Sequence, residues 1–156
     1  MKVKPIGIIH SPFLRPAGTP IQPVFGKGTE GAVEVLDEYA QGLKDLDGFE
    51  RIWLIYWFDR CRDYSLVVTP YMDTEERGLF ATRAPARPNP IGMSAVGLER
   101  VEGSKIYVSD IDILDGTPLL DIKPYSPKFD CFEVSRIGWL ENAARGNHKA
   151  DERFHR

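Results

Sequence analysis

Short runs of β-branched and aromatic residues recur along the chain, separated by stretches rich in proline, glycine and charged residues. This pattern is typical of strands joined by turns and loops. It predicts strands over residues 3–9, 31–36, 51–58, 66–69, 78–82, 93–102, 106–109 and 119–124. The run over residues 51–58 is the most apolar, and its composition indicates a strand buried on both faces.

Helical patterns are few. Residues 37–45 predict a short helix with Tyr39, Leu43 and Leu46 on one face and Gly48 after its end. A second short helix is predicted over residues 136–145. Doubly wound nucleotide-binding folds need strands that alternate with longer helices. We therefore predict a mainly β fold, a compact barrel-like sheet with one or two short helices, and not a Rossmann fold.

The length of 156 residues predicts a single domain over residues 1–156. Its core is expected at about residues 3–130, followed by a C-terminal tail over residues 131–156. The last residues, 148–156, are polar and are expected to be frayed.

Residues 80–92 stand out because three prolines divide them; we call this segment the excursion. Each proline lacks a backbone donor, fixes its own φ and extends the residue before it. The excursion therefore predicts a stiff connection between two strands. It holds groups that bind anions and hydrogen-bond to bases, namely Arg83, Arg87 and Asn89. Stiffness lowers the entropic cost of binding. The alternative is a proline-rich surface loop with two solvated arginines.

Three other segments offer candidate chemistry. Residues 11–31 form a long stretch without periodicity around Gln22 and Pro23, and such loops are often binding loops. Charged residues follow the aromatic strand at Asp59 and Arg60, either as part of a site or as a solvated strand end. Asp115 and Gly116 predict a turn in which the glycine has positive φ.

The strand after this turn should place Asp121 and Lys123 on one face and Leu120 and Ile122 on the other. Asp121 and Lys123 can also be read as a surface ion pair that contributes little to stability.

Composition narrows the functional classes. A net charge of −3 argues against nonspecific coating of nucleic acid. No apolar run is long enough for a membrane span, and the N-terminus lacks a signal-peptide core, so we expect a cytoplasmic protein. Cys61 and Cys131 are too few for a disulfide framework or a zinc site. We expect reduced thiols and no metal.

Two long motifs occur in order: Phe-Ala-Thr-Arg-Ala-Pro-Ala-Arg-Pro-Asn-Pro-Ile-Gly over residues 80–92, and Asp-Gly-Thr-Pro-Leu-Leu-Asp-Ile-Lys-Pro-Tyr over residues 115–125. Together they resemble the TsaA-like family, and the resemblance extends from residue 6 to about residue 130. It implies a β-barrel that binds S-adenosylmethionine without a Rossmann fold, in a homodimer with the cofactor near the interface. It also implies N6-methylation of threonylcarbamoyl-adenosine next to the tRNA anticodon, with the anticodon loop as the macromolecular partner.

Carried over by position, the resemblance implies cofactor contacts at Gln22, Pro23, Val24, Asp59, Arg60, Arg83, Arg87, Met93, Ile113, Leu114, Asp115 and Gly116. Arg83 or Arg87 can hold the cofactor carboxylate in a bidentate fork. Asn89 can orient the target base, and Asp115 or Asp121 can accept its proton. Two alternatives stay open: a non-catalytic small-ligand or RNA-binding barrel, and a hydrolase that uses His10 with Asp115 or Asp121.

Overall fold

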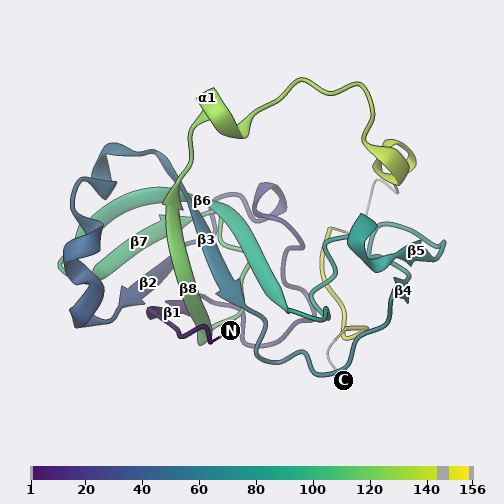
Figure 1. Ribbon diagram of the computed structural model, residues 1–156, viewed down its shortest axis with the longest axis horizontal. Helices are drawn as coiled ribbons and strands as arrows, with labels where there is room; N and C mark the ends of the chain where they lie inside the picture. Colours follow the sequence, from purple (N-terminus) through teal and green to yellow (C-terminus); the bar gives the residue numbers. More distant parts are fainter. Residues whose placement is uncertain (1, 144–147, 155–156) are drawn as a thin grey trace.

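A closed antiparallel barrel forms the larger part of the molecule in the computed structural model, which describes residues 2–143 and 148–154 (Figure 1). Its strands follow one another around the barrel in the order β1-β2-β7-β6-β3-β8. Their bounds are Gly7–His10 (β1), Gly31–Val35 (β2), Arg51–Trp57 (β3), Ile91–Glu102 (β6), Lys105–Ser109 (β7) and Thr117–Pro124 (β8). The prediction of a mainly β, barrel-like fold is confirmed.

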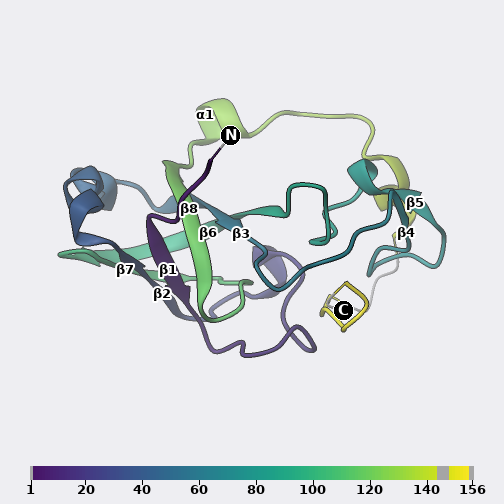
Figure 2. The same cartoon turned by 60° about the horizontal axis from the view of Figure 1, so that its bottom comes forward.

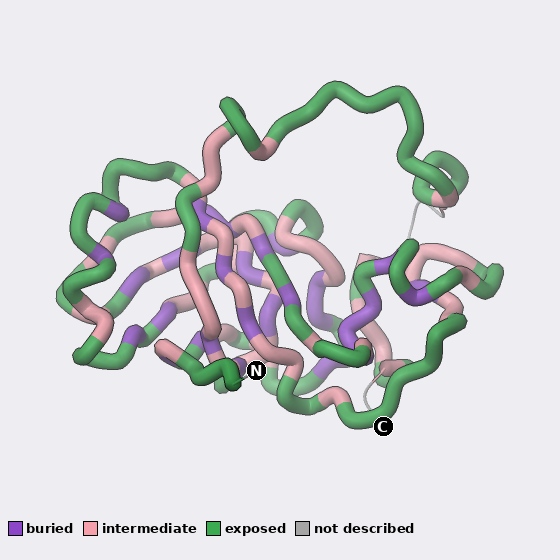
Figure 3. Tube along the Cα trace, in the orientation of Figure 1, coloured by how far each residue is buried: buried purple, intermediate pink, exposed green. Residues whose placement is uncertain are grey.

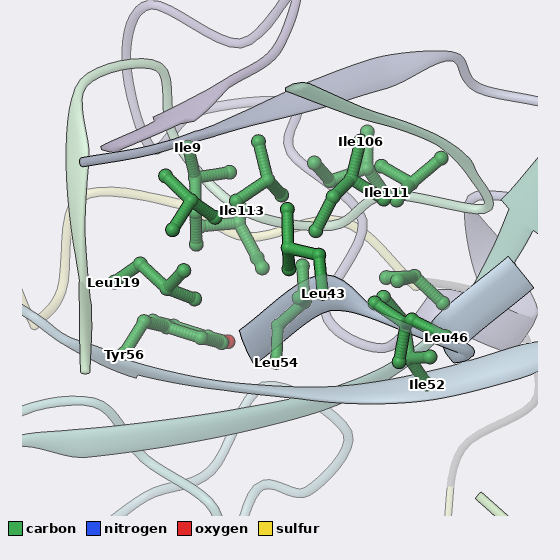
Figure 4. Close-up of a cluster of buried hydrophobic side chains, with 14 residues drawn as sticks. Ile9, Leu43, Leu46, Ile52, Leu54, Tyr56, Ile106, Ile111, Ile113 and Leu119 are labelled. Carbon is green, nitrogen blue, oxygen red and sulfur yellow. The ribbon is translucent and has the colours of Figure 1, made fainter. Parts of the chain in front are cut away.

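The barrel interior is filled by alternate residues of its strands. β3 turns Ile52, Leu54 and Tyr56 inward, where they join buried residues of every other barrel strand (Figure 4). Its outward residues, Trp53 among them, are half-buried. The prediction that β3 is buried on both faces is therefore wrong, because strong burial is confined to the inner face.

A bulge interrupts the pairing of β8 with β3. Asp121 lies opposite Ile55 and Leu119 lies opposite Tyr56, so Leu120 is the extra residue without a cross-strand partner. Leu119 is fully buried in the barrel instead. Strict alternation had predicted Leu120 on the inner face with Ile122, and only Ile122 packs against the core.

The described helices are short and mostly of the 3₁₀ type. η2 (Asp37–Leu43) and η3 (Leu46–Gly48) close one end of the barrel, and Leu43 and Leu46 contribute to its core. The predicted helix at residues 37–45 is thus a 3₁₀ helix. The others are η1 (Pro23–Phe25), η4 (Leu79–Ala81), η5 (Gly138–Asn142) and one α-helical turn, α1 (Pro127–Asp130).

Two predicted elements differ in the structure. The strand expected at residues 78–82 ends at Gly78, the last residue of β5 (Arg77–Gly78), which pairs with β4 (Val67–Val68). η4 follows at once and turns the chain toward the excursion. The helix expected at residues 136–145 is limited to η5, and residues 144–147 lie outside the described part of the chain.

The C-terminal residues run along the molecule as an open arch. Figure 1 shows residues 131–143 passing from α1 over the barrel to η5, and Figure 3 shows that this arch is mostly exposed. Residues 148–154, yellow in Figure 2, then lie beside the long N-terminal loop. Among the described residues, no helix has the length and apolarity needed to cross a membrane.

The expected fraying does not apply to residues 148–154. The amides of Gly18 and Ile21 donate to the carbonyls of Ala150 and His148, each at 3.0 Å, and Ala150 donates back to Thr19 at 2.7 Å. The Phe25 ring stacks on His148 with centroids 3.8 Å apart. These bonds clamp the long N-terminal loop.

Candidate active site

The excursion is held in shape by bonds to its own backbone. One guanidinium nitrogen of Arg87, Nη1, donates to the carbonyls of Leu79, Thr82 and Ala84 at 3.4, 3.0 and 3.2 Å. The Thr82 hydroxyl donates to Leu79 at 2.8 Å and accepts from the amide of Ala84. Arg87 therefore braces the excursion from within.

Arg83 extends outward from the same segment. Its side chain is exposed, and it donates to the Gln22 amide oxygen at 2.7 Å. This bond joins the excursion to the long N-terminal loop, two segments that sequence reasoning singled out independently. Because Gln22 is neutral, the Arg83 charge stays available for an anion.

A cavity of about 1310 Å³ lies between the barrel, the excursion, the N-terminal loop and the C-terminal arch. Of the residues predicted to bind a cofactor, ten line it: Gln22, Pro23, Val24, Asp59, Arg60, Arg83, Arg87, Met93, Ile113 and Leu114. The arch adds Trp139, which donates to the Ala81 carbonyl at 2.8 Å and ties η5 to the excursion. Cavities of this size accommodate molecules as large as a nucleoside cofactor.

Arg60 connects the rim after β3 to the turn before β8. Its guanidinium donates to the Asp115 carbonyl at 2.5 Å and to the Leu14 carbonyl at 3.1 Å. Gly116 has a φ of +79°, so the predicted turn is confirmed. Asp115 and Gly116 lie behind Arg60 and are not among the residues that line the cavity.

A chain of hydrogen-bonded polar side chains, which sequence reasoning missed, runs from buried Tyr56 and Ser94 to half-buried Asp112 in the cavity wall. The Ser94 hydroxyl donates to Asp112 Oδ1 at 2.6 Å and lies 3.1 Å from the Tyr56 hydroxyl. Ser94 and Tyr56 are 1% and 4% exposed, and all three residues line the cavity. Alternation in β3 and β6 would have placed Tyr56 and Ser94 inside, but nothing in the sequence aligns Asp112 with them.

Burial gives Asp112 unusual acid–base properties. Removal of the carboxylate from water raises its pKa to about 7, although the Ser94 hydroxyl, its own backbone amide and the Arg83 charge each favour the ionised form. Burial also raises the pKa of Tyr56, whose hydroxyl therefore stays protonated. Asp112 can thus exchange a proton near neutral pH.

Cys61 also lines the cavity but is a weak nucleophile. Burial, and then the nearby Asp59 carboxylate, raise the pKa of its thiol to about 11. The reactive thiolate is scarce at neutral pH. In the described part of the chain, no three His, Cys, Asp or Glu side chains gather as a metal site would require.

Asn89 and Asp121, two of the predicted catalytic residues, lie outside the cavity lining. Asn89 is exposed at the entry to β6, where its carbonyl accepts from the Ile91 amide at 2.7 Å. Asp121 pairs with Lys123 at 2.8 Å, the surface ion pair that the sequence also allowed.

Of the residues considered for a hydrolase, the structure brings His10 and Asp115 together. His10 Nδ1 lies 3.5 Å from Asp115 Oδ1, and His10 Nε2 lies 3.3 Å from Glu34. The neighbouring hydroxyl, Ser11, donates to the Ile113 carbonyl at 2.5 Å and accepts from the Phe13 amide. The Ser11 hydroxyl is bonded to backbone groups and not to His10, so His10 does not activate it as a nucleophile. His10 instead links the end of β1 to Asp115 and Glu34.

Comparison with known proteins assigns the chain to a family. A family model described as the tRNA-methyltransferase O N-terminal domain matches residues 8–131. The chain belongs to the TrmO N-terminal domain family. The resemblance read from the two sequence motifs is thereby confirmed, and both motifs lie inside the matched range.

Relatives of this TrmO-family chain carry two kinds of name. A probable S-adenosyl-L-methionine-binding protein from Pyrococcus abyssi is 56% identical over 153 residues, which are 97% of this chain and 83% of that protein. A mouse tRNA (adenine(37)-N6)-methyltransferase is 34% identical over 134 residues, 81% of this chain and 31% of the mouse protein.

The crystal structure of TrmO from Pseudomonas aeruginosa has the same fold. It matches with a TM-score of 0.74 and 37% identity over 88% of this chain. The match covers 62% of the TrmO chain, so the present chain spans less than two thirds of that protein.

Proposed function

We propose that this TrmO-family chain is an S-adenosylmethionine-dependent methyltransferase that acts on N6 of an adenine in tRNA. We propose threonylcarbamoyl-adenosine next to the anticodon as the specific substrate, and the cytoplasm as the location. The observation that carries the proposal is the Arg83–Gln22 bond, which joins the family's arginine-containing motif to the N-terminal loop over a cavity of suitable size. The names of the P. abyssi and mouse relatives support the cofactor and the reaction.

The groups around the cavity fit this cofactor chemically. Its carboxylate needs a cation, and Arg83 is exposed there with its hydrogen bond made to the neutral amide of Gln22. Its positively charged sulfur and amine favour nearby carboxylates, and Asp59 and Asp112 both line the cavity. Its adenine needs flat apolar walls, which the Phe58 ring can provide.

The cofactor, when bound, supplies an electrophilic methyl group. The protein's part is alignment, because an in-line displacement needs donor and acceptor close together and correctly oriented; such positioning can lower a barrier by roughly 7–11 kcal/mol at best. Arg87 keeps the excursion rigid, Arg83 anchors the ligand and Trp139 fixes the arch against the excursion.

A second candidate is a protein that binds S-adenosylmethionine without transferring its methyl group. This reading is favoured by the name of the P. abyssi relative, which states binding alone. Catalysis and binding would use the same cavity, so only turnover separates the two.

We also propose that the chain forms a homodimer. The outer face of β6 carries Ile91 and Met93, which are 44% and 46% exposed, and both residues line the cavity. A second copy placed over this face would bury them and supply a further wall for the cofactor.

The decisive experiment incubates the protein with labelled S-adenosylmethionine and tRNA that carries or lacks the threonylcarbamoyl group. Mass analysis of the digested nucleosides should find one added methyl on the modified adenosine of tRNA that carries the threonylcarbamoyl group. The tRNA that lacks this group should gain no methyl. Binding of cofactor by calorimetry without any methylated nucleoside would instead support the second candidate. Absence of both binding and transfer would exclude both functions.

A further inference from the structure

Packing alone does not explain why three hydrogen-bonded polar side chains, Tyr56, Ser94 and Asp112, lie together in the cavity wall. Burying a carboxylate costs free energy, and apolar residues in its place would not carry that cost. These three side chains nevertheless lie in the wall of the cavity, where the Asp112 carboxyl group can contact a ligand. It is held by a short hydrogen bond from a side chain that is itself 1% exposed.

Resting on the proposed function, we propose that Asp112 is the residue that accepts the proton of the target nitrogen during methyl transfer. The nitrogen lone pair forms the new bond to the methyl carbon, and the carbon–sulfur bond breaks with its electron pair retained by sulfur. The N–H proton passes to the Asp112 carboxylate, which becomes a neutral acid and later releases the proton to water. Charge balances, because a cation and a carboxylate become a neutral thioether and a neutral acid.

Asp112 suits this role better than the aspartates expected from the motif. Asp115 and Asp121 lie outside the cavity lining, and each already has a basic partner, His10 and Lys123 respectively. Asp112 lies in the cavity, and its pKa of about 7 is close to the value that makes a general base effective at neutral pH.

Among the described residues, two charged or titratable groups act on Asp112 from neighbouring elements, Arg83 and Tyr56. Arg83, from the excursion, favours the ionised carboxylate. Tyr56, from β3, stays neutral and acts on Asp112 through Ser94. Ser94 lowers the pKa of Asp112 by donating to the carboxylate, so removal of its hydroxyl should raise that pKa.

The test compares wild type, Asp112→Asn, Ser94→Ala and the exposed control Asp47→Asn. Without cofactor, carbon-13 NMR of labelled aspartate carboxyls should show a group with a midpoint near pH 7 in wild type and in Asp47→Asn. That signal should be lost in Asp112→Asn and should move to higher pH in Ser94→Ala. This readout does not depend on activity.

The pH dependence of the single-turnover methylation rate should then match the titration of Asp112. The rate in wild type should rise with pH through the NMR midpoint, and the Ser94→Ala profile should move to higher pH by the same amount. At saturating cofactor, Asp112→Asn should react at least about 100-fold more slowly than wild type. A rate within threefold of wild type, or a Ser94→Ala profile that does not move, would overturn the role of Asp112. An inactive wild type overturns the proposed function itself, which distinguishes the two failures.

Discussion

At the scale of single residues, the two arginines of the excursion have separate tasks. The sequence allowed either of them to hold the cofactor carboxylate, because both stand in one proline-rich motif. In the structure Arg87 donates to two carbonyls of the excursion and to that of the preceding Leu79, whereas Arg83 reaches across to Gln22. The first is a structural brace, and the second can anchor a ligand.

Arg83→Ala should therefore weaken cofactor binding by about 10- to 100-fold, the equivalent of a hydrogen bond to a charged group at about 1.5–3 kcal/mol, with little change in Tm. Arg87→Ala should mainly lower Tm. Calorimetry and thermal unfolding measure the two effects, with Arg100→Ala as control because Arg100 stacks on Tyr107 and pairs with Glu102. Equal loss of affinity with unchanged Tm in both excursion variants would contradict this division.

Asp112 should also make the free energy of unfolding depend on pH. Its pKa is raised from 3.8 to about 7, so the folded protein holds a proton that the unfolded chain releases in that interval. The resulting stability is complete below about pH 4 and is lost as pH rises to about 7. Urea unfolding should show wild type losing about 1–3 kcal/mol relative to Asp112→Asn between pH 4.5 and 8. Parallel stability profiles for the two proteins would refute the buried-carboxyl account.

At the scale of elements, β6 depends on a close approach to β3. A Cβ at Gly92 would overlap the rings of Tyr56 and Phe58, whose centroids lie 5.2 Å apart in an edge-to-face pair. A glycine at this position lets the cavity end of β6 pack directly on aromatic side chains.

Gly92→Ala should lower the free energy of unfolding by about 1–3 kcal/mol, the usual cost of overpacking a filled core. Gly78→Ala is the matched control, because a Cβ there meets nothing within 4 Å. Denaturant unfolding of both variants checks the difference. A Gly92→Ala protein as stable as the Gly78→Ala protein would mean that the rings move aside freely.

The barrel was largely predictable, because alternation and turn residues are local signals. The strand positions at Gly31–Val35, Arg51–Trp57 and Lys105–Ser109 lie within one residue of those expected. The bulge at Leu120 was not, since it arises from the pairing of β8 with the distant strand β3. The place of Asp112 in the site could not be predicted for the same reason, because it depends on a hydrogen bond from Ser94, eighteen residues away.

At the scale of the whole molecule, the C-terminal residues complete the cavity. The arch supplies Trp139, and residues 148–154 pin the N-terminal loop through Gly18 and Ile21. That loop carries Gln22, the partner of Arg83. The cavity is thus assembled from segments at opposite ends of the sequence.

Removal of residues 148–156 should therefore speed hydrogen exchange at the amides of Gly18 and Ile21, which lose their acceptors. The Thr19 amide donates to Pro16 within the loop and should change less, which provides an internal control. Exchange measured by NMR should leave the β3 amides protected. Unchanged exchange at Gly18 and Ile21 would show that the loop does not depend on this contact.

The proposed homodimer is a prediction for the same scale. Light scattering at micromolar concentration should give twice the monomer mass of 17.6 kDa. Met93→Glu places a charge on the exposed face of β6 and should shift the mass toward the monomer, while Glu99→Lys changes charge on the same strand away from the cavity lining. A monomer mass for the unmodified chain, with cofactor present, would remove a cofactor site shared between subunits.

The closure of the barrel has a consequence for how the chain is made. β8 is the last barrel strand in the sequence, and it bonds to both β1 and β3. Until residue 124 has left the ribosome, those two strands each keep an unpaired edge, and such edges associate readily with other chains. Closure also joins segments more than a hundred residues apart, which slows folding. The nascent chain is therefore exposed to association with other chains until β8 has been made and has closed the barrel.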